Sequence, residues 1–247
     1  AFVRLHEATG DPRWLTEAAS TSASLLELFW DGREGGVFST GNDADALVAR
    51  PKDLMDNATP SANSTTALGL ARLAALTGDE DYLRAIDRLW EDMVSRQMYL
   101  TGSVGVFEHG EGYSRPYDLP NLKAYNETCA AIANALWNHR MFLLHGEAKY
   151  IDVLERIIFH GFLSGISLSG DTFFYPNPLL SLGQHERSPW FACACCPSNL
   201  PRFMLSIPSH AYAVAGDRVF VNLFVQGAAR LALSAGEVRL EQQTRYP

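Results

Sequence analysis

The amino-acid sequence predicts a mainly α protein in which helical hairpins form a toroid and a β domain begins near the end of the chain. Three observations lead to this prediction: a repeated helix-stop signal, helical spacing of apolar residues, and a change of period after about residue 216. The composition is that of a globular protein, because 47% of the 247 residues are hydrophobic and 19% are charged. We expect a helical toroid over residues 1–215 and the beginning of a truncated β-sandwich domain over residues 216–247.

The helix-stop signal occurs three times at a constant interval. Gly10, Gly78 and Gly146 are 68 residues apart, and each is followed by an acidic residue and, four positions on, by an aromatic residue. Glycine adopts the left-handed conformation just past a helix end, and the acidic residue favours the start of the next helix. Regular helical hairpins with long connections are typical of a toroid of paired helices. Three unrelated helix turns in an all-α protein are the alternative explanation.

Apolar residues recur at three- and four-residue intervals in the segments that we expect to be helices. These segments are residues 5–9, 14–30, 64–76, 82–98, 129–145 and 150–164. Loops rich in Gly, Asp and Pro are expected at 31–40, with a short strand at 35–38, and at 50–63 and 102–123. The last of these loops is long and contains few apolar residues, which is often a sign of function.

Strand-like patterns replace the helical spacing near the end of the chain. Residues 218–225, 230–233 and 237–242 are rich in alternating or β-branched residues, with a Ser-Ala-Gly turn between the last two. The chain starts inside a predicted helix and stops in a predicted strand, so we expect it to be a piece of a longer protein. An exposed edge of the β domain would favour pairing with another chain, and a homodimer through this domain is one candidate assembly.

Charge and hydropathy narrow the range of partners. The formal net charge of −8 disfavours a nucleic-acid partner, since phosphate binding requires a basic face. No apolar run approaches the ~20 residues that a membrane-spanning helix needs, so we expect no membrane partner. The cysteines are not spread through the chain as in a disulfide framework, which favours a reducing compartment and a cytoplasmic location.

Crowded cysteines mark the first candidate site. Three of the four cysteines, Cys193, Cys195 and Cys196, fall within four positions, and Cys129 follows Glu127 by two residues. A disulfide between the neighbours Cys195 and Cys196 would be strained. Crowded thiols with a carboxylate indicate a metal site, for which zinc is the default ion. Glu127, Cys129, Cys195 and Cys196 can complete a four-ligand set, with Cys193 left as a structural residue. Buried free cysteines without a metal are the alternative.

A glutamate in the 102–123 loop is the second candidate. Glu111 lies between two glycines in the sequence Glu108-His109-Gly110-Glu111-Gly112. A glutamate in such a setting can approach a substrate closely and act as general acid and base. A solvated surface charge is the more common role of a loop glutamate.

Several motifs from about residue 86 to residue 247 occur together. They include His109-Gly110-Glu111, Asn126-Glu127-Thr128-Cys129, Trp137-Asn138-His139-Arg140, Phe174-Tyr175-Pro176-Asn177 and Cys193-Ala194-Cys195-Cys196-Pro197. This combination resembles glycoside hydrolase family 127, the β-L-arabinofuranosidases. The resemblance implies an (α/α)6 toroid followed by β-sandwich domains, and a retaining glycosidase that releases β-L-arabinofuranose from a small L-arabinofuranoside.

The resemblance also implies roles for individual residues. It implies Zn²⁺ held by Glu127, Cys129, Cys195 and Cys196. It further implies Cys195 as a nucleophile that forms a glycosyl-thioether, and Glu111 as acid and base. Retaining glycosidases normally use two carboxylates, and here a metal-activated thiolate replaces one of them. Tyr175 and His109 are candidate substrate-binding residues, with Tyr175 expected near the thiol.

The first 85 residues resemble a different group. Phe29-Trp30-Asp31, Gly35-Gly36-Val37-Phe38 and Thr59-Pro60-Ser61-Ala62-Asn63 are similar to the helical toroid of thioredoxin-domain proteins related to spermatogenesis-associated protein 20. A junction near residues 78–90 would make the toroid a hybrid. Two other functions stay open: a non-catalytic toroid with a structural zinc site, which four protein ligands would close, and a sugar isomerase or epimerase that works without a metal.

Overall fold

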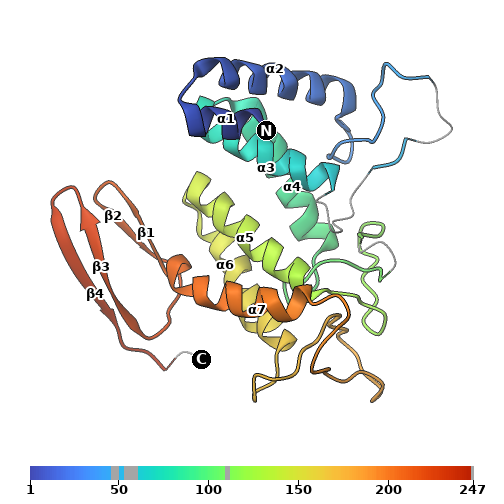
Figure 1. Ribbon diagram of the computed structural model, residues 1–247, viewed down its shortest axis with the longest axis vertical. Coiled ribbons are helices and arrows are strands. Elements are labelled where there is room, and N and C mark those ends of the chain that lie inside the picture. Colours follow the sequence, from blue (N-terminus) through green and yellow to red (C-terminus); the bar gives the residue numbers. More distant parts are fainter. Residues whose placement is uncertain (46–49, 53–60, 109–111, 246–247) are drawn as a thin grey trace. The chain divides into compact units, whose positions relative to one another are not determined.

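The computed structural model describes residues 1–45, 50–52, 61–108 and 112–245 (Figure 1). The chain divides into two compact units. The first unit comprises Ala1–Tyr99 and Gly105–Tyr125, and the second comprises Leu100–Val104 and Asn126–Pro247. This grouping keeps the later helices and the described strands in one unit, and the expected domain division between residues 215 and 216 stays a prediction.

Helical hairpins make up the first unit. Its helices are α1 (Phe2–Thr9), α2 (Pro12–Phe29), α3 (Ala62–Thr77) and α4 (Glu80–Asp92), followed by the π-helix η1 (Met93–Gln97). Gly10 and Gly78 end α1 and α3 in the left-handed conformation, each with φ of 69°. Asp11 and Asp79 then cap α2 and α4, because each carboxylate accepts a hydrogen bond from the amide two positions on. The helix-stop signal thus has the local structure that the sequence predicts.

Side-chain contacts join the hairpins of the first unit. The Tyr82 hydroxyl of α4 donates to the Ala19 carbonyl of α2 at 3.1 Å. The buried Asn63 at the start of α3 accepts from the Val37 amide at 2.7 Å and donates to the Val37 carbonyl at 3.0 Å. The short strand expected at 35–38 is reduced to a single bridge between Trp30 and Val37, because the Asn63 side chain occupies the backbone groups of Val37 that a strand partner would use.

The second unit is built around the α5–α6 hairpin, with α7 packed on α5 (Figure 1). Its helical elements are α5 (Thr128–His145), α6 (Ala148–Ile157), the π-helix η2 (Ile158–Phe162), the 3-10 helix η3 (Leu163–Gly165), α7 (Cys195–Ser206) and the 3-10 helix η4 (Ile207–His210). Phe162 and Phe203 meet edge to face at 5.0 Å in the core between these elements. Both rings are almost fully buried, so this packing holds α7 against η2.

Two features of the helices differ from the sequence prediction. Helix α7 was not predicted, since Pro197 and Pro201 interrupt the apolar spacing. Pro197 is tolerated because it lies in the first turn, where an N–H has no partner within the helix, and Pro201 lies inside the helix. The single helices expected at 82–98 and 150–164 each change from α-helix to a π-helical turn, and the second then continues into the 3-10 helix η3. Apolar spacing alone does not distinguish these turns from α-helical ones.

Antiparallel hairpins form the β part of the second unit. Strand β1 (Tyr212–Ala215) pairs with β2 (Arg218–Val221), and β3 (Gly227–Leu233) pairs with β4 (Gly236–Gln242). The Gln242 side chain donates to the Tyr212 hydroxyl at 2.6 Å and to the Leu223 carbonyl at 3.0 Å, which joins the two hairpins. Phe220 of β2 packs edge to face on Phe142 of α5 at 5.4 Å.

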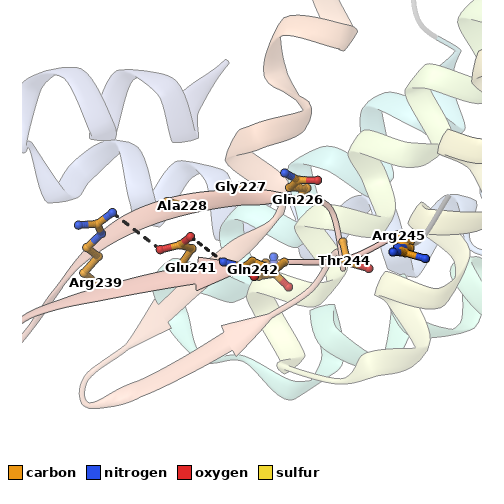
Figure 2. Close-up of a pocket in the computed structure, with 9 residues that line it drawn as sticks. Gln226, Gly227, Ala228, Arg239, Glu241, Gln242, Thr244 and Arg245 are labelled. Carbon is orange, nitrogen blue, oxygen red and sulfur yellow. Dashed lines mark hydrogen bonds and ion pairs between the residues drawn. The ribbon is translucent and has the colours of Figure 1, made fainter.

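A pocket of about 600 Å³ lies beside β3 and β4 (Figure 2). Gln226, Glu241, Thr244 and Arg245 are among its lining residues, and an ion pair joins Arg239 to Glu241 at 3.8 Å. Among the described residues, none of those that the sequence singles out for chemistry lines this pocket. Among the helices that the structure describes, none combines the length and hydropathy needed to cross a membrane.

Candidate metal and active site

The first turns of α5 and α7 supply the candidate metal ligands. Glu127 is the residue that precedes α5 and Cys129 lies in the first turn, while Cys195 and Cys196 are the first two residues of α7. The amides of a first helical turn have no partner within the helix, and the helix dipole there favours negative charge. Because α5 and α7 pack together, two such helix ends contribute to one cluster of anionic side chains.

The four ligand atoms lie close together. The carboxylate oxygen of Glu127 and the sulfurs of Cys129, Cys195 and Cys196 all fall within 4.8 Å of one another. The Cys196 sulfur is 3.5 Å from that of Cys129 and 3.7 Å from that of Cys195. Glu127 Oε1 is 3.5 Å from the Cys195 sulfur and 3.6 Å from the Cys196 sulfur.

These distances fit a tetrahedral ion. Metal–sulfur bonds of ~2.3 Å at tetrahedral angles separate two sulfurs by about 3.8 Å, and a metal–oxygen bond of ~2.1 Å separates oxygen from sulfur by about 3.6 Å. Four of the six separations, at 3.5–3.7 Å, are close to these values, and all six are within 4.8 Å. They are far longer than the ~2.05 Å of a disulfide, and the four cysteines are free. The cluster of Glu127, Cys129, Cys195 and Cys196 could therefore hold a metal ion.

The pKa values of the three cysteines in the cluster shift in different directions when only protein groups surround them. The hydrogen bond with the neighbouring Cys196 thiol lowers the pKa of Cys129 below its usual value. Burial raises the pKa of Cys195 to about 12, and the hydrogen bond to Cys129 together with burial raises the pKa of Cys196. Without a cation, Cys129 is therefore the thiol of this cluster that loses its proton most readily. A bound divalent cation would supply the charge that deprotonates the others.

Tyr175 lies beside the half-buried Cys195. Its hydroxyl is 3.1 Å from the Cys195 sulfur and 4.0 Å from the sulfur of Cys193. The hydroxyl lowers the pKa of Cys195, though less than burial raises it. Phe191 packs edge to face on the Tyr175 ring at 5.5 Å and limits its movement. Cys193, which we expected to be structural, is exposed.

Buried hydrogen bonds hold the Tyr175 segment against the start of α5. The Thr128 amide donates to the Tyr175 carbonyl at 3.0 Å, and the Thr128 hydroxyl donates to the Phe174 carbonyl at 2.8 Å. The side-chain amide of Asn177 donates to the backbone carbonyl of Asn126 at 2.9 Å and to the Thr128 hydroxyl at 3.0 Å. Asn126 has a φ of 42°, a left-handed conformation that asparagine tolerates. This network holds the Tyr175 segment beside Asn126 and Thr128, the residues on either side of the ligand Glu127.

Asn199 is a neighbour of the cluster that the sequence analysis missed. Its side-chain amide donates to the Cys129 sulfur at 3.0 Å. Asn199 follows Cys196 by three positions in α7, and residues at this spacing lie on one face of a helix. The spacing would have indicated Asn199 if the helix starting at Cys195 had been predicted.

Two of the predicted site residues, Glu111 and His109, lie outside the described residues. In the surrounding loop, the Val106 amide donates to the Gly112 carbonyl at 2.9 Å. The structure thus brings together the four predicted ligands and Tyr175, and the roles assigned to Glu111 and His109 stay predictions.

Comparison with known proteins identifies relatives of the whole chain. The model of the GH127 β-L-arabinofuranosidase catalytic domain matches residues 1–209. A non-reducing end β-L-arabinofuranosidase of Bifidobacterium longum subsp. longum is 33% identical over 192 residues, which are 72% of this chain and 29% of that protein.

Solved structures give the same result. A GH127 β-arabinofuranosidase is 43% identical with a TM-score of 0.78, and a GH127 β-L-arabinofuranosidase from Geobacillus stearothermophilus T6 is 33% identical with a TM-score of 0.76. Each match covers 100% of this chain, but only 37% and 42% of the respective solved chains. The chain thus spans well under half the length of these relatives. The predicted fold class, a mainly α helical toroid with a small β part at the C-terminal end, is confirmed.

The comparisons also find the second expected resemblance. Mouse spermatogenesis-associated protein 20 is 41% identical over 80 residues, which are 32% of this chain and 10% of that protein. The family-127 model nevertheless begins at residue 1, so it extends beyond the region of about 86–247 in which we expected it. Because the family model covers residues 1–209, which include the Glu-x-Cys and Cys-Cys residues of the cluster, the chain belongs to the GH127 β-L-arabinofuranosidase catalytic-domain family.

Proposed function

We propose that this chain is part of a retaining glycosidase that releases β-L-arabinofuranose. In this proposal a zinc-bound Cys195 is the nucleophile and Glu111 is the general acid and base. The observation that supports it most is the compact cluster of three sulfurs and one carboxylate in a member of family 127. The name of the Bifidobacterium relative, a non-reducing end β-L-arabinofuranosidase, supports a small L-arabinofuranoside as the substrate.

Zinc is the ion that this donor set favours. Soft thiolates select zinc over hard cations such as Mg²⁺ and Ca²⁺, and the separations of the ligand atoms fit tetrahedral coordination. Bound zinc supplies the positive charge that keeps the cysteines as thiolates at neutral pH. Access then favours Cys195 as the nucleophile over Cys196, since Cys195 is half-buried and Cys196 is 0% exposed.

The proposed reaction has two displacements. In the first, the Cys195 sulfur attacks the anomeric carbon while Glu111 gives its proton to the departing glycosidic oxygen, leaving a glycosyl-thioether. In the second, Glu111 takes a proton from water, the water oxygen attacks the anomeric carbon, and the sulfur leaves as a thiolate. Two inversions retain the configuration. Tyr175 would orient the Cys195 sulfur through its hydroxyl, and His109 would bind the sugar.

A non-catalytic zinc module is the second candidate. Four protein ligands close a zinc site, whereas catalytic sites usually keep one position open. The cluster has four such ligands, which favours a structural role. Alkylation of Cys195 by iodoacetamide in the zinc-loaded protein distinguishes the two candidates: labelling indicates a nucleophile, and an inert sulfur indicates a structural site. The isomerase or epimerase alternative is not favoured, because the matched family is one of glycoside hydrolases.

The proposed role of Glu111 is tested by Glu111→Gln. The variant is expected to bind zinc as the wild type does and to lose hydrolysis of an aryl β-L-arabinofuranoside by at least ~100-fold, the lower range for a general acid-base group. Glu108→Gln is the matched control, because Glu108 is an exposed glutamate in the same loop and should keep full activity. Equal activity in wild type and Glu111→Gln would overturn the assignment.

A further inference from the structure

We infer that Asn199 is a positioning residue of the metal site. Its side-chain amide orients Cys129 by donating a hydrogen bond to the Cys129 sulfur. The inference rests on the proposed zinc site. It separates the sulfurs of the cluster by role: Asn199 keeps Cys129 as a fixed ligand, while Cys195 stays available to react.

The geometry places Asn199 between the two helices that carry the ligands. Its Nδ2 atom is 3.0 Å from the Cys129 sulfur, so the contact runs from α7 to α5. Asn199 is four residues after Cys195 and three after Cys196, and these spacings set all three side chains on one face of α7. The side chain is half-buried, which limits competition from water for this hydrogen bond.

Charge explains why such a donor is useful. Three thiolates and one carboxylate carry four negative charges, and a divalent cation neutralises two of them. An amide N–H that donates to a thiolate takes up part of the remaining charge, and hydrogen bonds to charged acceptors are stronger than those between neutral groups. The sulfur that accepts the bond becomes a weaker nucleophile. Because the amide oxygen would repel a thiolate, the NH₂ group is the one that faces Cys129.

The side chains beside the Cys129 and Cys195 sulfurs differ. Cys129 receives the Asn199 amide at 3.0 Å, while Cys195 has the Tyr175 hydroxyl at 3.1 Å. Asn199 lies in the first turns of α7. The next residue, Leu200, is on the buried face of this helix, and its exposed fraction is 0%. Asn199 therefore has little freedom to move away from Cys129, as expected of a residue that orients a metal ligand.

The test compares three variants of the full chain. Asn199→Leu removes the donor at similar volume, and Asn199→Asp replaces it with a carboxylate that repels the thiolate. Arg202→Ala is the control, because Arg202 is an exposed residue of the same helix. Competition with a chromophoric chelator should show zinc bound ~10-fold more weakly by Asn199→Leu and ~100-fold more weakly by Asn199→Asp, the range for partners of metal ligands. Arg202→Ala should match the wild type.

Cobalt(II) gives a readout that a purely structural role would not change. A hydrogen bond to a thiolate lowers the energy of the sulfur electrons, so its removal should shift the sulfur-to-cobalt charge-transfer absorption of Asn199→Leu to longer wavelength. Circular dichroism of the same samples checks that the helices are retained. Unchanged zinc affinity and an unchanged cobalt spectrum in Asn199→Leu would overturn the inference while leaving the proposed function intact. A wild-type chain that binds neither zinc nor cobalt would instead overturn the proposed function, and the inference with it.

Discussion

At the scale of single residues, the chemistry of the cluster depends on the neighbour of each sulfur. Cys196 is fully buried between the other ligands, and Cys129 accepts the Asn199 amide. Cys195 is half-buried and lies beside the Tyr175 hydroxyl. Cys129 is half-buried as well, but its partner is the Asn199 amide rather than a hydroxyl, and the proposed mechanism assigns the nucleophile to Cys195.

Replacing Tyr175 by Phe tests the role of its hydroxyl. The hydroxyl lowers the pKa of Cys195. In the metal-free, reduced protein, its loss should therefore raise the pKa of the Cys195 thiol and slow alkylation at a fixed pH, since the thiolate is the reacting form. The rate of iodoacetamide labelling at Cys195 across pH 7–10, measured in a Cys193→Ser background, gives the result. A labelling profile identical to that of the parent would show that the hydroxyl does not act on this sulfur.

The sequence is enough to identify the four metal ligands, but not the side chains that form hydrogen bonds to them. The Glu-x-Cys and Cys-Cys spacing indicates the four ligands because thiols at such spacing are rare. Tyr175 was expected near the Cys195 thiol only because the chain resembles glycoside hydrolase family 127. Asn199 has no signal of its own, since an asparagine contacts a metal ligand only when a helix and its packing place it there. Partners of metal ligands come from tertiary structure, which residue spacing does not give.

At the scale of elements, helix boundaries are well predicted where glycine and aspartate mark them. Helix α5 was expected at 129–145 and spans Thr128–His145, with Gly146 in the left-handed conformation after it. Helix α7 was missed, although it carries two of the ligands, because its prolines hide the apolar spacing. The first strand was expected at 218–225, and β1 (Tyr212–Ala215) precedes it. Local signals thus predict helix ends, while irregular helices depend on packing.

Two glycines of α3 should respond in opposite directions to the same substitution. Gly69 lies within the helix with open space around it, so Gly69→Ala should stabilise the protein by about 0.5–1 kcal/mol. Gly78 ends the helix with a φ of 69°, so Gly78→Ala should destabilise it by about 1 kcal/mol, although nothing crowds the new methyl group. Urea unfolding of both variants measures the difference. A destabilised Gly69→Ala or a stabilised Gly78→Ala would show that the α3 boundary is wrongly placed.

At the scale of the whole molecule, stability should depend on pH through two packed histidines. The rings of His139 and His210 meet at 4.2 Å between α5 and η4. Burial, chiefly, lowers the pKa of His139 to about 4 and also lowers the pKa of His210. In the unfolded chain both rings titrate near 6.5. The unfolded state therefore binds more protons below that pH, and stability present above pH ~6.5 is lost as the pH falls toward 4.

His139→Gln isolates this contribution from other titrating groups. Between pH 7 and pH 5 the wild type should lose about 1–2 kcal/mol more unfolding free energy than the variant, given about 1.4 kcal/mol for each unit of pKa difference. Urea unfolding at pH 7, 6 and 5 measures both proteins. Equal losses in the two would mean that His139 is not held neutral by burial.

The central claim is that one zinc ion is held by three sulfurs and one carboxylate oxygen. X-ray absorption at the zinc edge of the reduced, zinc-loaded chain tests it most directly. The account predicts one zinc per chain with three sulfurs at ~2.3 Å and one oxygen at ~2.0–2.2 Å, and the loss of one sulfur in Cys129→Ser. A wild-type protein that binds no zinc, or binds it through nitrogen and oxygen alone, would contradict the account.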